Sequence, residues 1–480
     1  MAMHVRIHAP RGTRKRGAAT RAARSNVVKT RAKSCDRLDA WLAERGVPKQ
    51  PVKPEHVDGR LGCVATRDVM PGEQVLRVPQ EFAITAVDVA EHPEASAAKE
   101  HGDLVGLALW LLAEQARGES SEYAPYVETF AGESLSPLLW TQEERDDLLK
   151  GSPTKEVVDG QLRELEKTFE QLQQEHFEPD PDKYPSRHYN LESFKRAFVA
   201  VLSRTIYLPS ADCFALVPLA DMIKKPADGS GGLIDFSIEE DAVVMTTPRS
   251  ILDGEEILAG GGIERSSGEM LIVTGHVDAD AYDTDYLNWD TELVQADKLY
   301  SFKKQILEDK GLSTKQSFPV YVDRIPRQLL SFLRLSRVQD PSDFFKISFE
   351  EDQKVSEANE YEVLMLMMAE CQERMGKYGA DLDNDFQIKN NPESTPKDVV
   401  AADLRINEKR VLRGTMDGIR RRLAPIRKVP TKKGMQDPNQ DIIDMFNELE
   451  KLPGKPKEFL TSLLSRDKGK DKSRGSSPPR

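Results

Sequence analysis

The strongest constraint on the fold is the order of patterns in this 480-residue chain, in which helical pattern separates two strand-rich stretches. Short strand-like runs, joined through the Pro71-Gly72 turn, predict a small β-meander near the start. Residues 104–205 then carry apolar side chains at helical spacing, and strand-like runs return over 211–277. A chain this long needs more than one core. The pattern predicts an α+β fold with a β core over 36–280, split by an all-α insert at about 100–205.

The pattern after the second strand-rich stretch predicts a separate helical domain over residues 285–425. Its strongest amphipathic segments are Glu360–Lys377 and Asp398–Leu423, and the second becomes basic toward its end. From Arg427 the sequence is rich in Lys, Pro, Gly and Ser, so residues 426–480 are expected to be a mostly disordered tail. A short helix is expected to interrupt that tail at Asp441–Lys451.

Charge is unevenly distributed along the chain. Residues 1–35 hold ten Lys and Arg and no acid, so a net charge of −12 leaves −22 for the rest. An acidic body argues against binding of nucleic acid, which needs clustered cations. No apolar run reaches the roughly 20 residues that a membrane span requires.

The four cysteines include no C-x-x-C pair, so no metal site is expected and a reducing compartment is favoured. The Arg-rich, acid-free arm at residues 1–35 has the composition of an organellar transit peptide. A disordered basic tail, or a nuclear import signal, is the alternative.

A set of short motifs occurs in collinear order between about Leu38 and Leu423. The motifs are Gly59–Ala65, Pro137–Trp140 with Glu143-Glu144, Phe198–Arg204, Val217–Ile223, Asp253–Ile257, Leu299-Tyr300 with Gly311-Leu312, Pro326–Leu335 and Ile406–Arg410. Together they resemble the Rubisco large-subunit methyltransferase-like branch of SET proteins. The resemblance implies a SET core split by a helical insert, a helical substrate-binding domain, and S-adenosylmethionine-dependent protein-lysine N-methylation in a chloroplast.

The resemblance also implies which residues would form the site. Gly59, Gly62, Arg204 and Asp221 match family positions near the cofactor, although Arg60 and Leu61 shift the glycine spacing. After Asp221 the family has Asn-His, where this chain has Lys224-Lys225. A cation beside a sulfonium would be repelled.

The family's catalytic tyrosine falls on Thr274, its following phenylalanine on His276, and a second family tyrosine on Gly261. Threonine is too short to put its hydroxyl where a tyrosine hydroxyl would lie. The sequence therefore favours a SET protein that binds a plastid protein partner, with methyl transfer reduced or lost.

The alternative is an active protein-lysine N-methyltransferase acting on a stromal protein, with Tyr207, Tyr282 or Tyr286 supplying the hydroxyl. A nuclear chromatin protein or a mitochondrial location is a further alternative. Three features that could suggest chemistry have simpler interpretations. Gly260–Gly262 is expected to be a loop, and His276 and Cys213 are expected to be packed or surface residues.

Overall fold

A computed structural model of the chain describes residues 34–57, 60–132, 134–226, 229–260, 264–279 and 284–426. The predictions for the basic arm over 1–33, for Gly59, Gly261 and Tyr282, and for the tail after Ile426 lie outside the described residues. Chain contacts divide the protein into two compact units. The first contains Met1–Leu139 and Gly160–Glu264, and the second contains Trp140–Asp159 and Arg265–Arg480.

The described residues of the first unit form five small antiparallel strand pairings. Strand β1 (Val52–Val57) pairs with β2 (Arg60–Ala65), and β3 (Gln74–Pro79) pairs with β8 (Ala242–Thr246), which also pairs with β7 (Ile234–Ser237). Strand β6 (Cys213–Leu216) lies between β4 (Ile84–Thr85) and β5 (Ile206–Leu208). The strand-like pattern predicted over residues 211–277 includes β7 and β8, which form a hairpin.

The predicted meander is wrong in its pairing. Gly72 makes the expected turn with a φ of 81°, but its N–H donates to Thr247 at 2.7 Å, and β3 continues along β8 rather than β2. A turn motif fixes where the chain reverses, whereas the strand partner depends on residues about 170 positions away.

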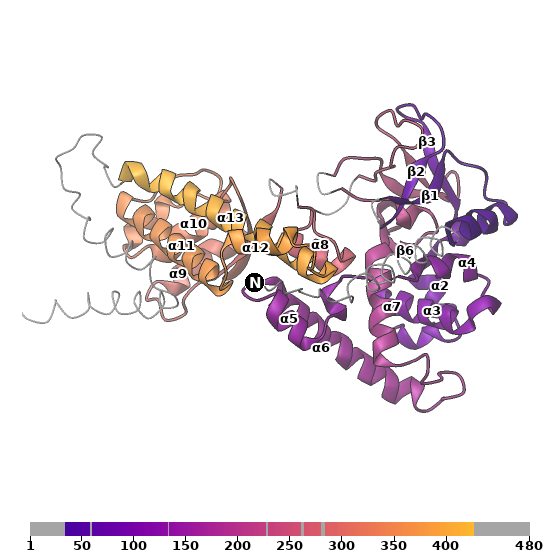
Figure 1. The fold of residues 1–480 in the computed structure, drawn as a ribbon. Helices are drawn as coiled ribbons and strands as arrows, with labels where there is room; N and C mark the ends of the chain where they lie inside the picture. Colours follow the sequence, from indigo (N-terminus) through magenta and orange to yellow (C-terminus); the bar gives the residue numbers. More distant parts are fainter. Residues whose placement is uncertain are drawn as a thin grey trace, which may run out of the picture. The chain divides into compact units, whose positions relative to one another are not determined.

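The helices of the first unit form a layer beside its strands (Figure 1). Residues 34–44 are helical, and short and long helices follow between the strands of the first unit. They are α2 (Ala86–Glu91), α3 (Asp103–Arg117), α4 (Ala124–Val127) and α7 (Leu191–Arg204). Helix α3 is buried from Val105 to Glu114, and α7 packs against it. Helix α6 (Thr154–Leu172) contributes Leu165, Phe169 and Leu172 to the same core.

An extended segment at residues 255–260 crosses the first unit, and it determines where several candidate residues lie. Its backbone N–H groups donate alternately to two different neighbours: Ile257 to Cys63 and Ala259 to Lys224, each at 2.9 Å. Gly260 donates to Gly232, also at 2.9 Å. A side chain at Gly232 would meet the backbone oxygen of Thr246 at 2.1 Å, so the crossing requires a bare backbone there. Gly260 is therefore a packed crossing residue rather than part of a loose loop.

The second unit is mainly helical. Its helices are α5 (Gln142–Leu148), α8 (Ser267–Thr274), α9 (Tyr300–Glu308), α10 (Arg327–Arg337), α11 (Glu357–Lys377), α12 (Leu382–Asn390) and α13 (Pro396–Ile426). Helices α10, α11 and α13 lie side by side around a core that includes Leu330, Leu333 and Met367 (Figure 1). The helical prediction is confirmed, except that the unit also contains an antiparallel pair of strands. It consists of β9 (Tyr286–Glu292) and β10 (Lys315–Tyr321).

Within the described part of the chain, no helix is both long and apolar enough to cross a membrane.

Candidate functional site

Asp221 is the centre of a buried polar network in the first unit. Its side chain is fully buried and accepts hydrogen bonds from Arg204 Nη2 at 2.8 Å and from the Tyr126 hydroxyl. Burial raises the pKa of the Asp221 carboxyl above its usual range, against the opposing effect of the Arg204 charge. Burial also raises the pKa of the Tyr126 phenol well above its usual value, so that group stays a donor. The structure thus brings together Arg204 and Asp221, two residues that the resemblance assigns to the cofactor site.

Arg204 is held on every side by this network. Its guanidinium lies 4.3 Å from the centre of the Phe130 ring, and it donates to Thr129 Oγ1 at 3.3 and 3.4 Å. The side chain is only 11% exposed. Its Nε is buried with no hydrogen-bond partner among the described residues. Because Asp221 neutralises the guanidinium, Arg204 acts here first as a buried structural cation.

The backbone just before Asp221 is strained. Leu219 has a φ of 72° and a ψ of −49°, a conformation that a residue with a branched side chain rarely adopts. Its carbonyl oxygen accepts a hydrogen bond from Cys63 Sγ at 3.4 Å. Burial raises the pKa of the Cys63 thiol well above its usual value, which keeps it protonated. Such strain concentrates at functional segments in proteins, and here it sets the direction in which Asp221 points.

Gly62 lies beneath an ion pair. Arg60 donates to both oxygens of Glu256, at 2.6 and 2.8 Å. A Cβ on Gly62 would meet Glu256 Oε1 at 2.9 Å. The small residue that the resemblance assigns to the cofactor therefore has a local packing reason in this chain.

Lys224 and Lys225 follow Asp221 directly. The Lys224 backbone forms an isolated parallel bridge with Leu258 on the crossing segment, opposite the side on which Cys63 pairs. Both lysines are half-buried. Gly62 and Lys224 thus flank one segment, and Arg204 and Asp221 lie in the same unit.

Thr274 belongs to the second unit. It is the last residue of α8, is exposed, and donates its hydroxyl to the Met270 carbonyl oxygen at 2.7 Å. Gly275 follows in the left-handed conformation with a φ of 69° and ends the helix. The position that the resemblance assigns to a catalytic tyrosine is therefore an ordinary helix end.

Two tyrosines considered as substitutes already use their hydroxyls. Tyr286, in the second unit, donates to Glu269 Oε2 at 2.7 Å, and burial raises the pKa of its phenol. Tyr207, in the first unit, donates to Asp212 at 2.5 Å and is exposed. The hydrogen bond to Asp212 raises the pKa of the Tyr207 phenol. His276, like Tyr286, lies in the second unit.

Polar side chains of α13 between Arg405 and Lys409 join this helix to other elements of the second unit. These contacts are called the α13 clamp. Arg405 donates to Asp385 Oδ1 at 2.8 Å and to the Leu148 carbonyl. Asn407 donates to Ser267 Oγ at 3.0 Å, and Lys409 donates to Asp385 Oδ2 at 2.5 Å. Residues 405–409 therefore tie α5, α8 and α12 to α13. Since α8 ends at Thr274, this clamp also positions that residue.

Glu408 is the buried acid of the clamp. It accepts hydrogen bonds from Ser152 Oγ at 2.7 Å, the Tyr378 hydroxyl at 3.0 Å and Thr154 Oγ1 at 3.2 Å. Burial raises the pKa of Glu408 to about 7, although these donors oppose the rise. The group is therefore partly protonated near neutral pH.

Comparison with known proteins finds similar sequences and similar folds. Residues 294–412 match the family model described as Rubisco LSMT substrate-binding. The solved "Structure of Rubisco LSMT bound to AdoMet" covers 86% of this chain, and 99% of that chain, with a TM-score of 0.69 and 22% identity. The chain is therefore similar to Rubisco LSMT-like SET proteins in sequence and in fold.

Curated relatives carry methyltransferase names. The Nicotiana tabacum "Ribulose-1,5 bisphosphate carboxylase/oxygenase large subunit N-methyltransferase, chloroplastic" is 25% identical over 80% of this chain and 81% of that protein. The Arabidopsis thaliana "[Fructose-bisphosphate aldolase]-lysine N-methyltransferase, chloroplastic" is 26% identical over 78% and 80%. The Danio rerio "Actin-histidine N-methyltransferase" is 27% identical over 58% and 48%.

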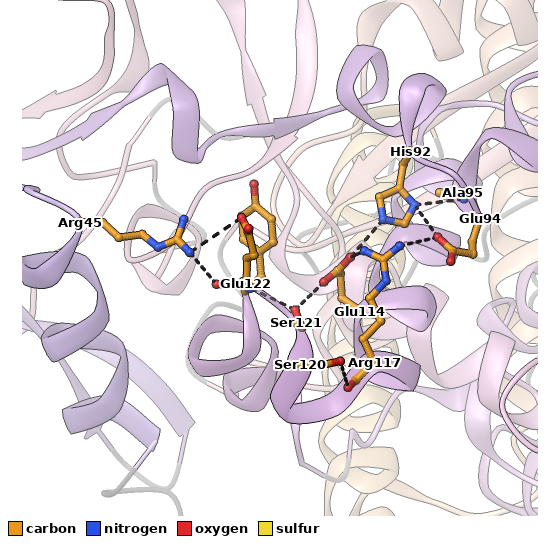
Figure 2. Close-up of polar contacts among 10 residues, drawn as sticks. Arg45, His92, Glu94, Ala95, Glu114, Arg117, Ser120, Ser121 and Glu122 are labelled. Atoms are coloured by element: carbon orange, nitrogen blue, oxygen red, sulfur yellow. Dashed lines mark hydrogen bonds and ion pairs between the residues drawn. The ribbon is translucent and has the colours of Figure 1, made fainter.

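The helical insert of this SET protein contains a second polar cluster that could be mistaken for a catalytic triad (Figure 2). His92 Nε2 lies 3.0 Å from Glu114 Oε1, and the Ser121 hydroxyl donates to Glu114 Oε2. Ser121 and His92 thus bind the same carboxylate instead of each other, so the histidine does not activate the serine.

Arg117 joins the cluster by donating to Glu114 and Glu94, each at 2.6 Å. Burial would raise the pKa of Glu114, but hydrogen bonds from His92 and Ser121, with the Arg117 charge, lower it overall. The cluster ties α3 to the segment before it and is a structural feature of the insert.

Some residues of the two buried polar networks could not be predicted from the sequence. Tyr126 and Thr129 complete the Arg204–Asp221 network, yet they precede the residues they bond by 95 and 75 positions. No spacing or motif signal links them to Asp221. Ser152 and Thr154 serve Glu408 from about 255 residues away, and only the polar side chains inside the 406–410 motif hinted at such partners.

Proposed function

We propose that this Rubisco LSMT-like SET protein binds a protein partner through its C-terminal helical domain and has lost most or all of its methyl-transfer activity. The observation that carries the proposal is the state of Thr274, whose hydroxyl is bonded within its own helix and which has no aromatic ring. The matched substrate-binding region at residues 294–412 supports the retained half of the function.

Methyl transfer makes one bond and breaks one. A neutral amine nitrogen attacks the methyl carbon, the carbon–sulfur bond breaks, and the sulfonium becomes a neutral thioether. Catalysis depends on holding the two reactants in line and stabilising the charge as it moves. Thr274 contributes neither the ring nor the hydroxyl that the family places at this point.

S-adenosylmethionine is the cofactor that the comparisons support, since similar solved structures are described as bound to AdoMet or AdoHcy. The residues of this chain fit it poorly. Lys224 and Lys225 replace the family's Asn-His, and two cations disfavour a sulfonium. Arg204 is already neutralised by Asp221.

The second candidate is an active S-adenosylmethionine-dependent protein-lysine N-methyltransferase. The methyltransferase names of the relatives and the intact Arg204–Asp221 pair favour it. It requires a hydroxyl donor other than Thr274. Tyr286 is the strongest choice in the second unit, although Glu269 already accepts its hydrogen bond.

Incubation with methyl-tritiated S-adenosylmethionine and chloroplast stromal proteins separates the two candidates. The proposal predicts no protein labelling above that seen with the heat-denatured chain. Labelling that requires the folded chain would overturn it.

The proposal places the protein in the plastid, because the similar plant enzymes are chloroplastic and residues 1–35 have the composition of a transit peptide. Residues 1–35 fused to a fluorescent protein should bring it into plastids. Accumulation in the nucleus or mitochondria would contradict this placement.

A further inference from the structure

Four arginines lie on two segments of the second unit that pack against each other. Arg324 and Arg327 flank the turn before α10, and Arg413 and Arg421 lie on α13. All four side chains are exposed. They are called the arginine cluster below.

Close backbone packing brings the two arginine pairs together. A Cβ on Gly414 of α13 would lie 2.0 Å from the Val322 carbonyl oxygen, so the turn rests directly on the helix. One turn later, a Cβ on Gly418 would lie 3.8 Å from both Ile325 Cδ1 and Arg421 Nη2. Arg421 on α13 and Ile325 in the turn that carries Arg324 therefore lie beside the same glycine.

The charges of the cluster are not used in ion pairs. Among the described residues, no salt bridge forms to any of its four members, and the nearby Asp417 pairs with Arg420 at 2.8 Å. Asp323 is the one acid within the turn itself. The rest of the chain after residue 35 is strongly acidic, so an unpaired group of cations here is a local exception.

Arg327 opposes the local electrostatics of its own helix. It is the first residue of α10, whose first turn has no acidic residue. A cation at a helix N-terminus is unfavourable by about 0.3–1 kcal/mol. Helix stability therefore does not explain Arg327. Breaking a local rule in this way is typical of residues kept for binding.

A run of contacts leads from the cluster toward α8. The Arg324 guanidinium lies 4.1 Å from the centre of the Tyr321 ring, and that ring lies 5.6 Å from the ring of Tyr286. Tyr286 in turn donates to Glu269 on α8, the helix that ends at Thr274. The cluster and the position of the missing tyrosine are thus connected within one unit.

We propose that the arginine cluster is the docking surface for an acidic stretch of the partner protein. This inference rests on the proposed function and adds the chemistry of the partner. Arginine presents a planar fork of donors that matches a carboxylate, and the cluster contains no lysine. Its small extent, the presence of Asp323 and the acidic body favour a short acidic peptide over the extended phosphate backbone of a nucleic acid.

The test uses the full chain and a fluorescent octa-glutamate peptide that carries one photo-crosslinking residue. Binding is measured by anisotropy at low and moderate salt, and crosslinked residues are mapped by mass spectrometry. The proposal predicts crosslinks at 321–327 and 410–421. Changing Arg324, Arg327, Arg413 and Arg421 together to Gln should weaken binding at least tenfold and remove these crosslinks.

A matched control changes four exposed arginines of the first unit, Arg163, Arg187, Arg196 and Arg249, to Gln, which alters net charge equally. It should bind within twofold of the unchanged chain. Three results overturn the proposal: crosslinks confined to 1–33 or 427–480, equal loss in both variants, or tighter binding of a single-stranded oligonucleotide that depends on the same cluster. Titration of S-adenosylmethionine into the cluster variant distinguishes the two proposals, because it reports on the methyl-transfer half alone.

Discussion

The hydroxyl of Thr274 donates to the carbonyl oxygen of Met270, 2.7 Å away and one turn earlier in the same helix. A hydroxyl engaged in this way contributes little to the rest of the protein, and the side chain is exposed. The position is therefore structurally replaceable, which is unexpected for a catalytic residue and natural for one that has lost its role.

Replacement of Thr274 by Ala should change stability little. Alanine has a better helix propensity, and the lost hydrogen bond is local. We expect a change in the free energy of unfolding of about 0.5 kcal/mol or less, as for most surface substitutions. Thr141→Ala is the control, because Thr141 caps α5 with a capping box. It should cost about 1 kcal/mol. A larger loss at Thr274 than at Thr141 in urea denaturation would contradict the helix-end interpretation.

Replacement of Asp221 by Asn should strongly destabilise the chain. It leaves the Arg204 charge buried among Tyr126, Phe130 and Thr129 without its counter-ion. Removing one member of a buried pair costs about 3–5 kcal/mol. The control is Glu192→Gln, which breaks the exposed pair with Arg196 and should cost under about 1 kcal/mol. Similar losses for the two variants would show that the Asp221 network is not structural.

Glu408 should make stability fall as the pH rises toward neutrality. Its pKa is about 7 in the folded chain and near 4.5 when unfolded, so the folded state holds the proton more tightly. The contribution of Glu408 to the free energy of unfolding is therefore greatest below about pH 4.5 and is lost as the pH rises through 7. Relative to Glu408→Gln, the unfolding free energy should drop by on the order of 3 kcal/mol between pH 4.5 and 8.

The groups facing Glu408 are Ser152, Thr154, Tyr378 and, by charge, Asp285. Comparing two variants at each pH cancels the titration of more distant groups. Glu393→Gln, at an exposed loop position, provides the surface reference. A pH-independent difference between the unchanged chain and Glu408→Gln would refute the assignment.

Two glycine substitutions should separate backbone crossing from side-chain packing. Gly232→Ala would place a Cβ 2.1 Å from the Thr246 backbone oxygen, so strands must shift, at a cost of about 2 kcal/mol or more. Gly62→Ala would crowd the ends of the Glu256 and Arg60 side chains, which can move, and would touch Val57 Cγ2 at an ordinary contact distance of 3.5 Å. Its cost should be about 1 kcal/mol or less. Thermal unfolding of both variants measures which substitution costs more stability. The reverse order would mean that the crossing segment is not fixed as described.

The sequence pattern predicted the elements that are formed by residues close together along the chain. Helix α3 follows from its long apolar run, and the β7–β8 hairpin joins strands adjacent in sequence. Strand β3 was predicted with the wrong partner because β8 lies far along the chain. Helix α12 was missed because it is held by buried Asp385, paired with Arg405 and Lys409, rather than by an apolar stripe.

The candidate site shows the same division. Arg204 and Asp221 were assigned by resemblance, and the structure brings them together, but their partner Tyr126 has no sequence signal. The meaning of Thr274 required the structure, because only the geometry shows where its hydroxyl points.

The central claim is that the altered site no longer supports the family's cofactor chemistry, and paired calorimetric titrations of S-adenosylmethionine test it most directly. The full chain is compared with a variant carrying Lys224→Asn and Lys225→His, which restores the family's residues. The account predicts weak or undetectable binding by the unchanged chain and binding at least tenfold tighter by the variant, a gain of about 1.4 kcal/mol or more. One-to-one binding at micromolar concentration by the unchanged chain, with no gain in the variant, would contradict it.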